Sequence, residues 1–206
     1  MITEKPVITE KIKERLYPVV LQQFSMKDFH AVNVRDISKE SGISTGTIYK
    51  YFSSKEDLCF SIIDEKLRDL ASLLKMHLEG IEDIREMFRR IFWVTMNFFD
   101  NNPGLAAIIF ITVPLKSFMT NKSYQRETDV DILIEIIEKA RINGVIRTDI
   151  ENQHFVDLYM MIICRHVQNW YVDGMKWKLA NTINIFFDFF WRAVAPLYDQ
   201  ESKLHY

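Results

Sequence analysis

The chain has 206 residues, of which 48% are hydrophobic and 26% are charged, and its formal net charge is −2. This composition supports a packed core and excludes an intrinsically disordered chain. The length suits one large domain or a small domain joined to a larger one. The near-neutral charge neither indicates nor excludes a nucleic-acid partner.

Cys59 and Cys164 are the two cysteines, and they form no pattern typical of a disulfide framework. The charged N-terminus lacks the apolar centre of a signal peptide. No apolar run reaches the ~20 residues that a membrane-spanning helix needs. We therefore expect a soluble, cytoplasmic protein.

Apolar residues recur every three or four positions, and 6 glycines and 5 prolines are few, so we expect an all-α fold. The first predicted helix carries an apolar stripe from Ile12 to Phe24, with Pro18 as a kink or an irregular start. Asn33 and Ser44 are predicted to cap two short helices. A capping box at residues 53–56 then opens a long helix to about residue 78.

The remainder of the chain is also predicted to be helical. We expect helices over about 82–100, 104–113 and 123–143, a helix from a second capping box at 148–151 to about 172, and a last helix over about 178–197. Pro114, Gly144 and Gly174 follow three of these helices, and proline and glycine are typical of helix ends.

Residues 33–52 read NVRDISKESGISTGTIYKYF. Two short helices joined by a tight turn with glycine are typical of a helix-turn-helix, whose second helix enters the major groove of DNA. Ile37, Ile43 and Ile48 are spaced to pack the two helices together. The hydroxyl and ammonium groups of the second helix are then left to face phosphate oxygens and base edges.

The segment GISTGTIYKYFSSKEDL resembles the signature of the TetR family, and VRDISKESG upstream matches it as well. The resemblance runs from about Thr9 to Asp69, although Pro18, Asp28 and Ser38 depart from the usual pattern. It implies an N-terminal three-helix helix-turn-helix domain at 9–69, with its motif at 33–52, and a C-terminal helical ligand-binding and dimerisation domain at 70–206. It also implies that Tyr49 and Lys55 contact phosphates. The predicted DNA-binding residues are Arg35, Ser44, Thr45, Gly46, Thr47, Tyr49, Lys50, Tyr51 and Lys55.

The resemblance implies a ligand cavity among the helices of residues 82–172, and the abundance of Phe, Met and Ile there suggests an apolar or amphipathic ligand. The candidate pocket residues are Phe88, Phe92, Met96, Phe110, Phe118, Met160, Arg165 and His166. Plain core packing is the alternative for the apolar members. Arg165 and His166 either orient a polar ligand group or are a surface arginine and a hydrogen-bonded core histidine.

The last helix, LANTINIFFDFFWRAVAPL, is apolar on nearly every side, which predicts burial on every side. The resemblance implies that the last two helices of each subunit form a four-helix interface in a homodimer. The candidate interface residues are Cys164, Val167, Trp170, Ile183, Phe187, Phe190 and Val194. Core packing within one subunit remains the alternative.

We predict neither enzymatic activity nor a cofactor or metal. No two histidines lie four apart, the Glu151-x-x-His154 pair has no second copy, and the G-x-S-x-G, P-loop and G-x-G-x-x-G motifs do not occur. The favoured function is a ligand-responsive DNA-binding regulator, a repressor that a small effector releases from a palindromic operator. A helical interaction protein without a DNA role and a transcriptional activator of the same fold are the alternatives.

Overall fold

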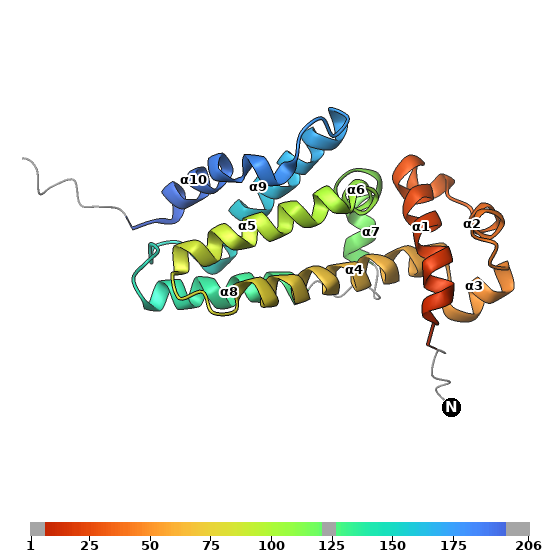
Figure 1. Cartoon of the computed structure of the whole chain (residues 1–206), viewed down its shortest axis with the longest axis horizontal. Helices are drawn as coiled ribbons and strands as arrows, with labels where there is room; N and C mark the ends of the chain where they lie inside the picture. Colours follow the sequence, from red (N-terminus) through yellow and green to blue (C-terminus); the bar gives the residue numbers. More distant parts are fainter. Residues whose placement is uncertain (1–6, 121–126, 197–206) are drawn as a thin grey trace, which may run out of the picture.

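The computed structural model describes residues 7–120 and 127–196, and all regular structure in this part is helical, which confirms the all-α prediction (Figure 1). The elements are α1 (Glu10–Met26), η1 (Phe29–Ala31), α2 (Val34–Ser41), α3 (Thr45–Tyr51), α4 (Lys55–Leu78), α5 (Ile84–Asn101), α6 (Pro103–Ala107), η2 (Ile108–Thr112), α7 (Leu115–Thr120), α8 (Glu127–Ile142), α9 (Asn152–Val172), η3 (Leu179–Thr182) and α10 (Ile183–Val194). None of the described helices combines the length and hydropathy that a bilayer crossing requires.

Helices α1, α2 and α3 form a group at one end of the molecule, and α4 runs from that group along the rest of the fold (Figure 1). Leu16, Phe24, Ile37, Ile48 and Leu58 are buried where these four helices meet. The apolar spacing that predicted the short helices therefore also supplies their common core. The recognition helix of the predicted motif is fixed to the start of the longest helix.

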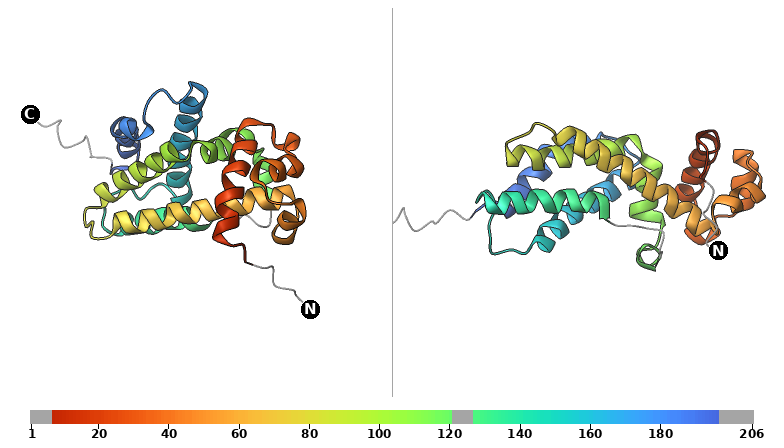
Figure 2. Two further views of the ribbon diagram at one scale, coloured as in Figure 1. Left: turned by 45° about the vertical axis from the view of Figure 1, so that its right-hand side comes forward. Right: turned by 90° about the horizontal axis from the view of Figure 1, so that it is seen from below.

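The C-terminal helices form a layered bundle beside α4. Helix α5 lies along α4 and α8, and α9 and α10 cover the opposite side of α5 (Figures 1 and 2). An aromatic cluster fills the space between α5 and α10, where the ring centroid of Phe92 lies 5.1 Å from that of Phe190 and 6.0 Å from that of Phe187. Because these rings interlock, the layers are packed together as a solid core.

Two predicted helices differ from the observed ones. In the first, a proline changes the backbone hydrogen bonding, and in the second, a side chain binds the backbone of the predicted first turn. The helix predicted over 104–113 begins as α6 but continues as the π-helical η2, ahead of Pro114. The capping box at 148–151 does not form, and α9 begins at Asn152 without a side-chain cap. Arg141 instead donates to the carbonyl oxygens of Thr148 (2.9 Å) and Ile150 (2.5 Å), which holds this segment as a loop.

The predicted bounds of two further helices also differ from those of α8 and α10 in the structure. The helix predicted over 123–143 corresponds to α8, and its first residues, 123–126, lie outside the described residues. The helix predicted over 178–197 starts with the short η3 before α10. Asp100, in the last turn of α5, accepts hydrogen bonds from the backbone N–H groups of Leu179 (2.8 Å) and Ala180 (3.0 Å), so η3 is capped from another helix.

The first turn of α4 is closed by a capping box one residue later than predicted. The Ser54 hydroxyl accepts from the backbone N–H of Asp57 (3.0 Å), and the Asp57 carboxylate accepts from the backbone N–H (2.7 Å) and hydroxyl (2.8 Å) of Ser53. The negative charge of the Asp57 carboxylate also interacts favourably with the positive end of the helix dipole. The start of α4 is therefore rigidly defined.

Lys55 cross-links this first turn to the loop between α1 and α2. Its ammonium donates to the carbonyl oxygens of Phe29 (3.1 Å), His30 (2.8 Å) and Val32 (3.0 Å). An ammonium has three N–H donors, and all three are used here. In this structure the ammonium is therefore bound to the protein's own backbone, and the phosphate contact of Lys55 stays a prediction.

Replacing Lys55 by Met should lower the free energy of unfolding by about 2 kcal/mol, because three carbonyl oxygens lose a charged donor. Urea denaturation followed by circular dichroism measures this. Lys75→Met is the matched control, since Lys75 lies on the same helix and is exposed without a hydrogen bond in the described structure. Equal stability of the two variants would contradict the cross-link.

Candidate nucleic-acid interface

The two short helices are built by local caps at both ends. The Asn33 side chain accepts from the backbone N–H of Arg35 (2.9 Å), and the Ser44 hydroxyl accepts from the backbone N–H of Thr47 (3.1 Å). Between the helices, Gly42 has φ 65°, in the left-handed region that glycine occupies without strain. These features confirm both predicted caps and the tight turn.

A side chain of α1 locks that turn. Arg15 donates to the carbonyl oxygen of Gly42 (3.1 Å), and a Cβ atom on Gly42 would lie 2.4 Å from the Arg15 Nη2 atom. Glycine is therefore needed at this position for its conformation and for the approach of the arginine. The contact joins α1 to the turn that precedes α3.

The outer face of α3 carries polar side chains that are exposed to solvent. Tyr49 is 54% exposed, Lys50 is exposed, and a Cβ atom on Gly46 would meet no atom closer than 3.9 Å. Thr45 is half-buried in the first turn of α3. This face can come close to another molecule and offers a hydroxyl, a phenol and an ammonium to it.

The remaining predicted DNA-binding residues have more local roles. Arg35 is exposed in the first turn of α2, while Ser44 is the cap of α3 and shares a hydrogen bond of 2.8 Å with the Thr47 hydroxyl. Tyr51 is half-buried, and the Lys50 ammonium lies 5.8 Å from its ring centroid. Tyr51 therefore supports Lys50 more than it presents a surface of its own.

A polar depression of about 460 Å³ lies beside α3, between the starts of α2 and α4. It is lined by His30, Ala31, Val32, Asn33, Val34, Tyr49, Ser53, Ser54, Lys55 and Glu56. The N-termini of α2 and α4 face this region with backbone N–H groups, which attract anions. The Tyr49 phenol completes a site that suits a phosphate group.

The predicted ligand-pocket residues lie apart from the depression beside α3. None of them lines that depression or four other cavities formed by described residues. Phe88, Phe92 and Met96 are fully buried in the core, and Phe110 and Phe118 pack against Phe99 and Phe60 at 5.0 and 5.1 Å. In this structure their side chains fill the core, and their role as pocket walls stays a prediction.

The same holds for the polar candidates of that pocket. The His166 ring nitrogen Nε2 lies 2.6 Å from the Thr182 hydroxyl, and its ring centroid lies 4.2 Å from that of Phe186 with the rings tilted by 43°. Burial lowers the pKa of His166, with a smaller opposing effect of Asp100, so the neutral ring is favoured. Arg165 is exposed and Met160 is 38% exposed. His166 is the hydrogen-bonded core histidine of the second alternative.

The predicted interface residues also point inward. Val167, Trp170, Ile183, Phe187, Phe190 and Val194 are at most 3% exposed, and Cys164 is half-buried. The opposite face carries Met161, 62% exposed, Ile185, 59% exposed, and Phe189, 60% exposed. In this structure the predicted set packs in the core of one chain, because α10 turns its 183–187–190–194 stripe towards α5 and a second apolar stripe outward. The place of the set in a dimer interface stays a prediction.

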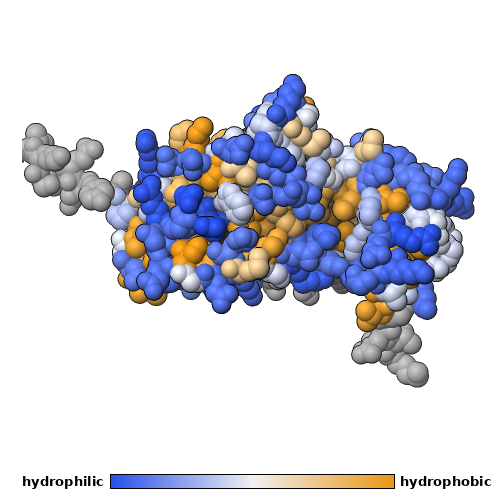
Figure 3. Space-filling model, in the orientation of Figure 1, coloured by the Kyte–Doolittle hydropathy of each residue, from blue (hydrophilic) through white to orange (hydrophobic). Residues whose placement is uncertain are grey.

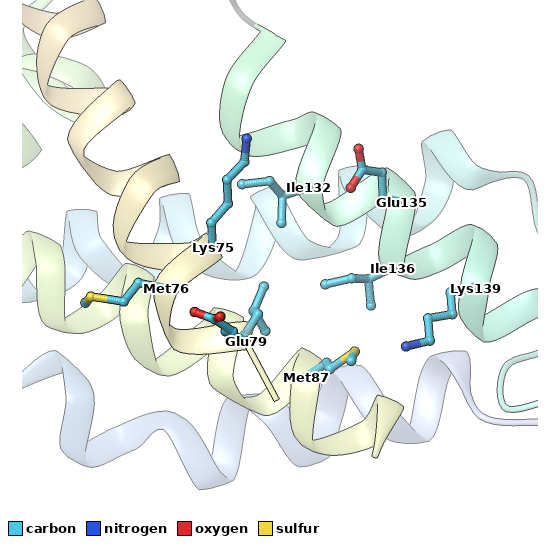
Figure 4. Close-up of a pocket in the computed structure, with 9 residues that line it drawn as sticks. Lys75, Met76, Glu79, Met87, Ile132, Glu135, Ile136 and Lys139 are labelled. Carbon is cyan, nitrogen blue, oxygen red and sulfur yellow. The ribbon is translucent and has the colours of Figure 1, made fainter. Parts of the chain in front are cut away.

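An open groove of about 580 Å³ lies between the end of α4, the start of α5 and α8 (Figure 4). Its floor is apolar and includes Met87, Ile132 and Ile136, while Lys75 and Lys139 lie on opposite sides of it. The ammonium group of neither lysine has a hydrogen bond or ion pair with any described residue. The groove therefore combines an apolar floor with two ammonium groups and with the carboxylates of Glu79 and Glu135. The sequence analysis missed it, since its residues come from three helices with no shared motif.

Comparison with known proteins identifies the N-terminal part. Residues 21–62 match the model for bacterial regulatory proteins of the tetR family. An uncharacterised HTH-type transcriptional regulator of Mycobacterium tuberculosis is 26% identical over 106 residues, which span about half of each chain (52%). The HTH-type transcriptional regulator YdgC of Bacillus subtilis is 22% identical over 169 residues, or 80% of this chain and 83% of YdgC.

Solved structures share the fold. The fatty acid degradation regulator FadR from Bacillus halodurans has a TM-score of 0.77 at 19% identity, over 90% of this chain and 96% of that chain. FadR from Bacillus subtilis, solved in complex with stearoyl-CoA, has a TM-score of 0.78 at 18% identity, over 86% of this chain and 96% of that chain. Residues 21–62 thus match the tetR-family model, and the fold along most of the chain matches that of the two FadR structures.

Proposed function

We propose that this protein is a ligand-responsive transcriptional repressor that binds a palindromic operator as a homodimer. The observation that carries the proposal is the outer face of α3, where Thr45, Gly46, Tyr49 and Lys50 stand beside a polar depression at two helix N-termini. A rigid scaffold behind this face, from Arg15 to the α4 cap, favours a fixed register on DNA. We propose residues 9–69 as the DNA-binding domain and 70–206 as the effector and dimer domain.

The side chains on this face would contact different parts of the DNA. Tyr49 and the depression beside it suit backbone phosphates, which fix the position of the protein without selecting a sequence. Thr45 and Lys50 suit base edges in the major groove, and Gly46 allows close approach. Arg35, at the start of α2, offers a further phosphate contact.

Selection of duplexes from a random pool tests the proposal. Tyr49→Ala should weaken binding to all duplexes alike, because it removes a phosphate contact. Thr45→Ala or Lys50→Ala should also change the selected sequence, with a loss of about 1–3 kcal/mol on the parent's site. Lys178→Ala, exposed and remote from α3, is the control. If the parent selects no duplex, or Tyr49→Ala binds as tightly as the parent, the proposed interface is wrong.

The exposed apolar stripe of α9 and α10 supports a dimer. Met161, Ile185 and Phe189 are each about 60% exposed, and apolar surface gathers over α10 in Figure 3. Clustered apolar surface of this kind marks contact sites in soluble proteins. Two copies joined here would present two α3 helices to half-sites about 34–36 Å apart, or a multiple of that distance.

Phe189→Asp should give a folded monomer with weak operator binding, because a carboxylate would be buried at the subunit contact. Light scattering and circular dichroism report mass and folding. Phe187→Asp is the matched contrast: Phe187 is 2% exposed, so a charge there should disrupt the fold itself. A Phe189→Asp protein that keeps the mass of a dimer would show that the contact lies elsewhere.

The groove between α4, α5 and α8 is the proposed effector site. Its floor of Met87, Ile132 and Ile136 suits an alkyl chain, and its charged lining, Lys75 and Lys139 with Glu79 and Glu135, suits a polar head group whose anionic part binds at the lysines. The solved complex of FadR from Bacillus subtilis with stearoyl-CoA, a fold neighbour, supports an amphipathic, anionic effector with a long acyl chain. By linkage, an effector that prefers the DNA-free conformation releases the operator.

Stearoyl-CoA is the first effector to test, by fluorescence anisotropy of the labelled operator complex. We expect release from the parent, and release at about tenfold higher concentration from the double variant Lys75→Glu/Lys139→Glu, whose charges repel an anion. Met160→Glu, in the earlier predicted pocket, should behave like the parent. Loss of response in Met160→Glu but not in the double variant would move the effector site away from the groove.

A further inference from the structure

Two side-chain hydrogen bonds join the C-terminal helices to α1 at a place away from α4. Gln168 of α9 donates its amide N–H to the carbonyl oxygen of Phe110 in η2 (2.9 Å). Thr112, at the end of η2, donates its hydroxyl to the carbonyl oxygen of Phe24 in the last turn of α1 (2.8 Å). The two bonds make η2 a bridge between α9 and α1.

Each bond fills a backbone acceptor that the helices themselves leave free. In an α-helix the Phe110 carbonyl would accept from the residue four positions on, which is Pro114 and has no N–H. The segment widens into a π-helical turn, with the Val113 N–H on the Ile108 carbonyl at 3.2 Å. The Phe24 carbonyl belongs to the last turn of α1, where no helical donor follows.

The bridge also rests on close packing. A Cβ atom on Gly104 of α6 would lie 3.7 Å from the Leu21 carbonyl oxygen and 3.8 Å from the Leu21 Cβ, so α6 and α1 approach closely. The Phe110 ring meets the Phe99 ring edge-on at 5.0 Å, which ties η2 to α5 as well. A shift of α9 relative to α5 would therefore move η2 and, through Thr112, the end of α1.

Helix α4 holds a different part of α1. Glu65 accepts from the Lys13 ammonium (2.7 Å) and from the Tyr17 hydroxyl (2.8 Å), both in the first half of α1. Helix α1 is thus held near its start by α4 and at its end by η2. A change in one attachment relative to the other tilts α1, and Arg15 carries that tilt to the turn before α3.

We propose that Gln168 and Thr112 are positioning residues that couple α9 to the recognition helix through η2, as a second route beside α4. Helix α9 packs on α8, which forms one wall of the groove, and it carries part of the exposed apolar stripe. The inference rests on the proposed function, because it describes how effector and dimer state reach the DNA-binding helices. Since coupling is reciprocal, DNA binding must alter α9 through the same bonds.

Hydrogen–deuterium exchange with and without the duplex selected above tests the route. The variants are Thr112→Val and Gln168→Leu, and the control is Gln153→Leu, whose amide donates to Asp157 on the same helix. DNA should slow exchange in residues 160–172 of the parent and the control. That slowing should disappear in both test variants, while their duplex affinity changes by less than about tenfold, the range of one neutral hydrogen bond.

The outcomes separate this inference from the proposed function. Equal slowing of 160–172 in all four proteins overturns the η2 route and leaves the proposed function intact. If no duplex is selected, the proposed function fails, and the bridge itself is tested by urea unfolding of the single and double variants. Non-additive losses of stability support a bridge through η2, and additive losses overturn it.

Discussion

Lys55 places a charge where the chain would otherwise leave three carbonyl oxygens of the α1–α2 loop without donors. The Phe29 ring lies 5.8 Å from the same ammonium and packs on Phe24 and Phe60, so the cross-link sits directly on the N-terminal core. Because Lys55 also begins α4, the helix-turn-helix and the longest helix form one mechanical unit. Any movement of α4 relative to its neighbours is therefore a movement of the recognition helix.

A densely packed core decides where a ligand can bind. Phe88, Phe92 and Phe190 occupy the middle of the C-terminal bundle and are at most 1% exposed, so the described structure has no room for a ligand there. The groove at the end of α4 avoids that conflict, since it is an open groove between α4, α5 and α8. Its floor touches α4, α5 and α8 together, which makes it well placed to change their spacing.

Helix α10 has two apolar faces, one packed against α5 and one exposed. Phe187 and Phe190 turn towards α5, while Ile185 and Phe189 remain on the surface. Exposed aromatic surface is unfavourable in water, so a covering partner would stabilise the molecule. Helix α9 shares this outer face and also reaches η2 through Gln168, so the surface that would join two copies is connected to the helices that would bind DNA.

The amino-acid sequence by itself determined the helical class, the caps at Asn33 and Ser44 and the left-handed turn at Gly42, because these depend on residues a few positions apart. It also indicated the exposed polar face of α3, since the isoleucines of that motif must point inward. Burial of the last helix was predicted only in part, because periodicity shows that a helix is apolar and not which side meets which neighbour. The hydrogen bonds of Lys55 and of the bridge through η2 join residues 23 to 88 positions apart, and the aromatic core and the groove also bring together residues of separate helices. Only the tertiary structure decided these, because such contacts follow from how the helices pack and leave no periodic or local signal in the chain.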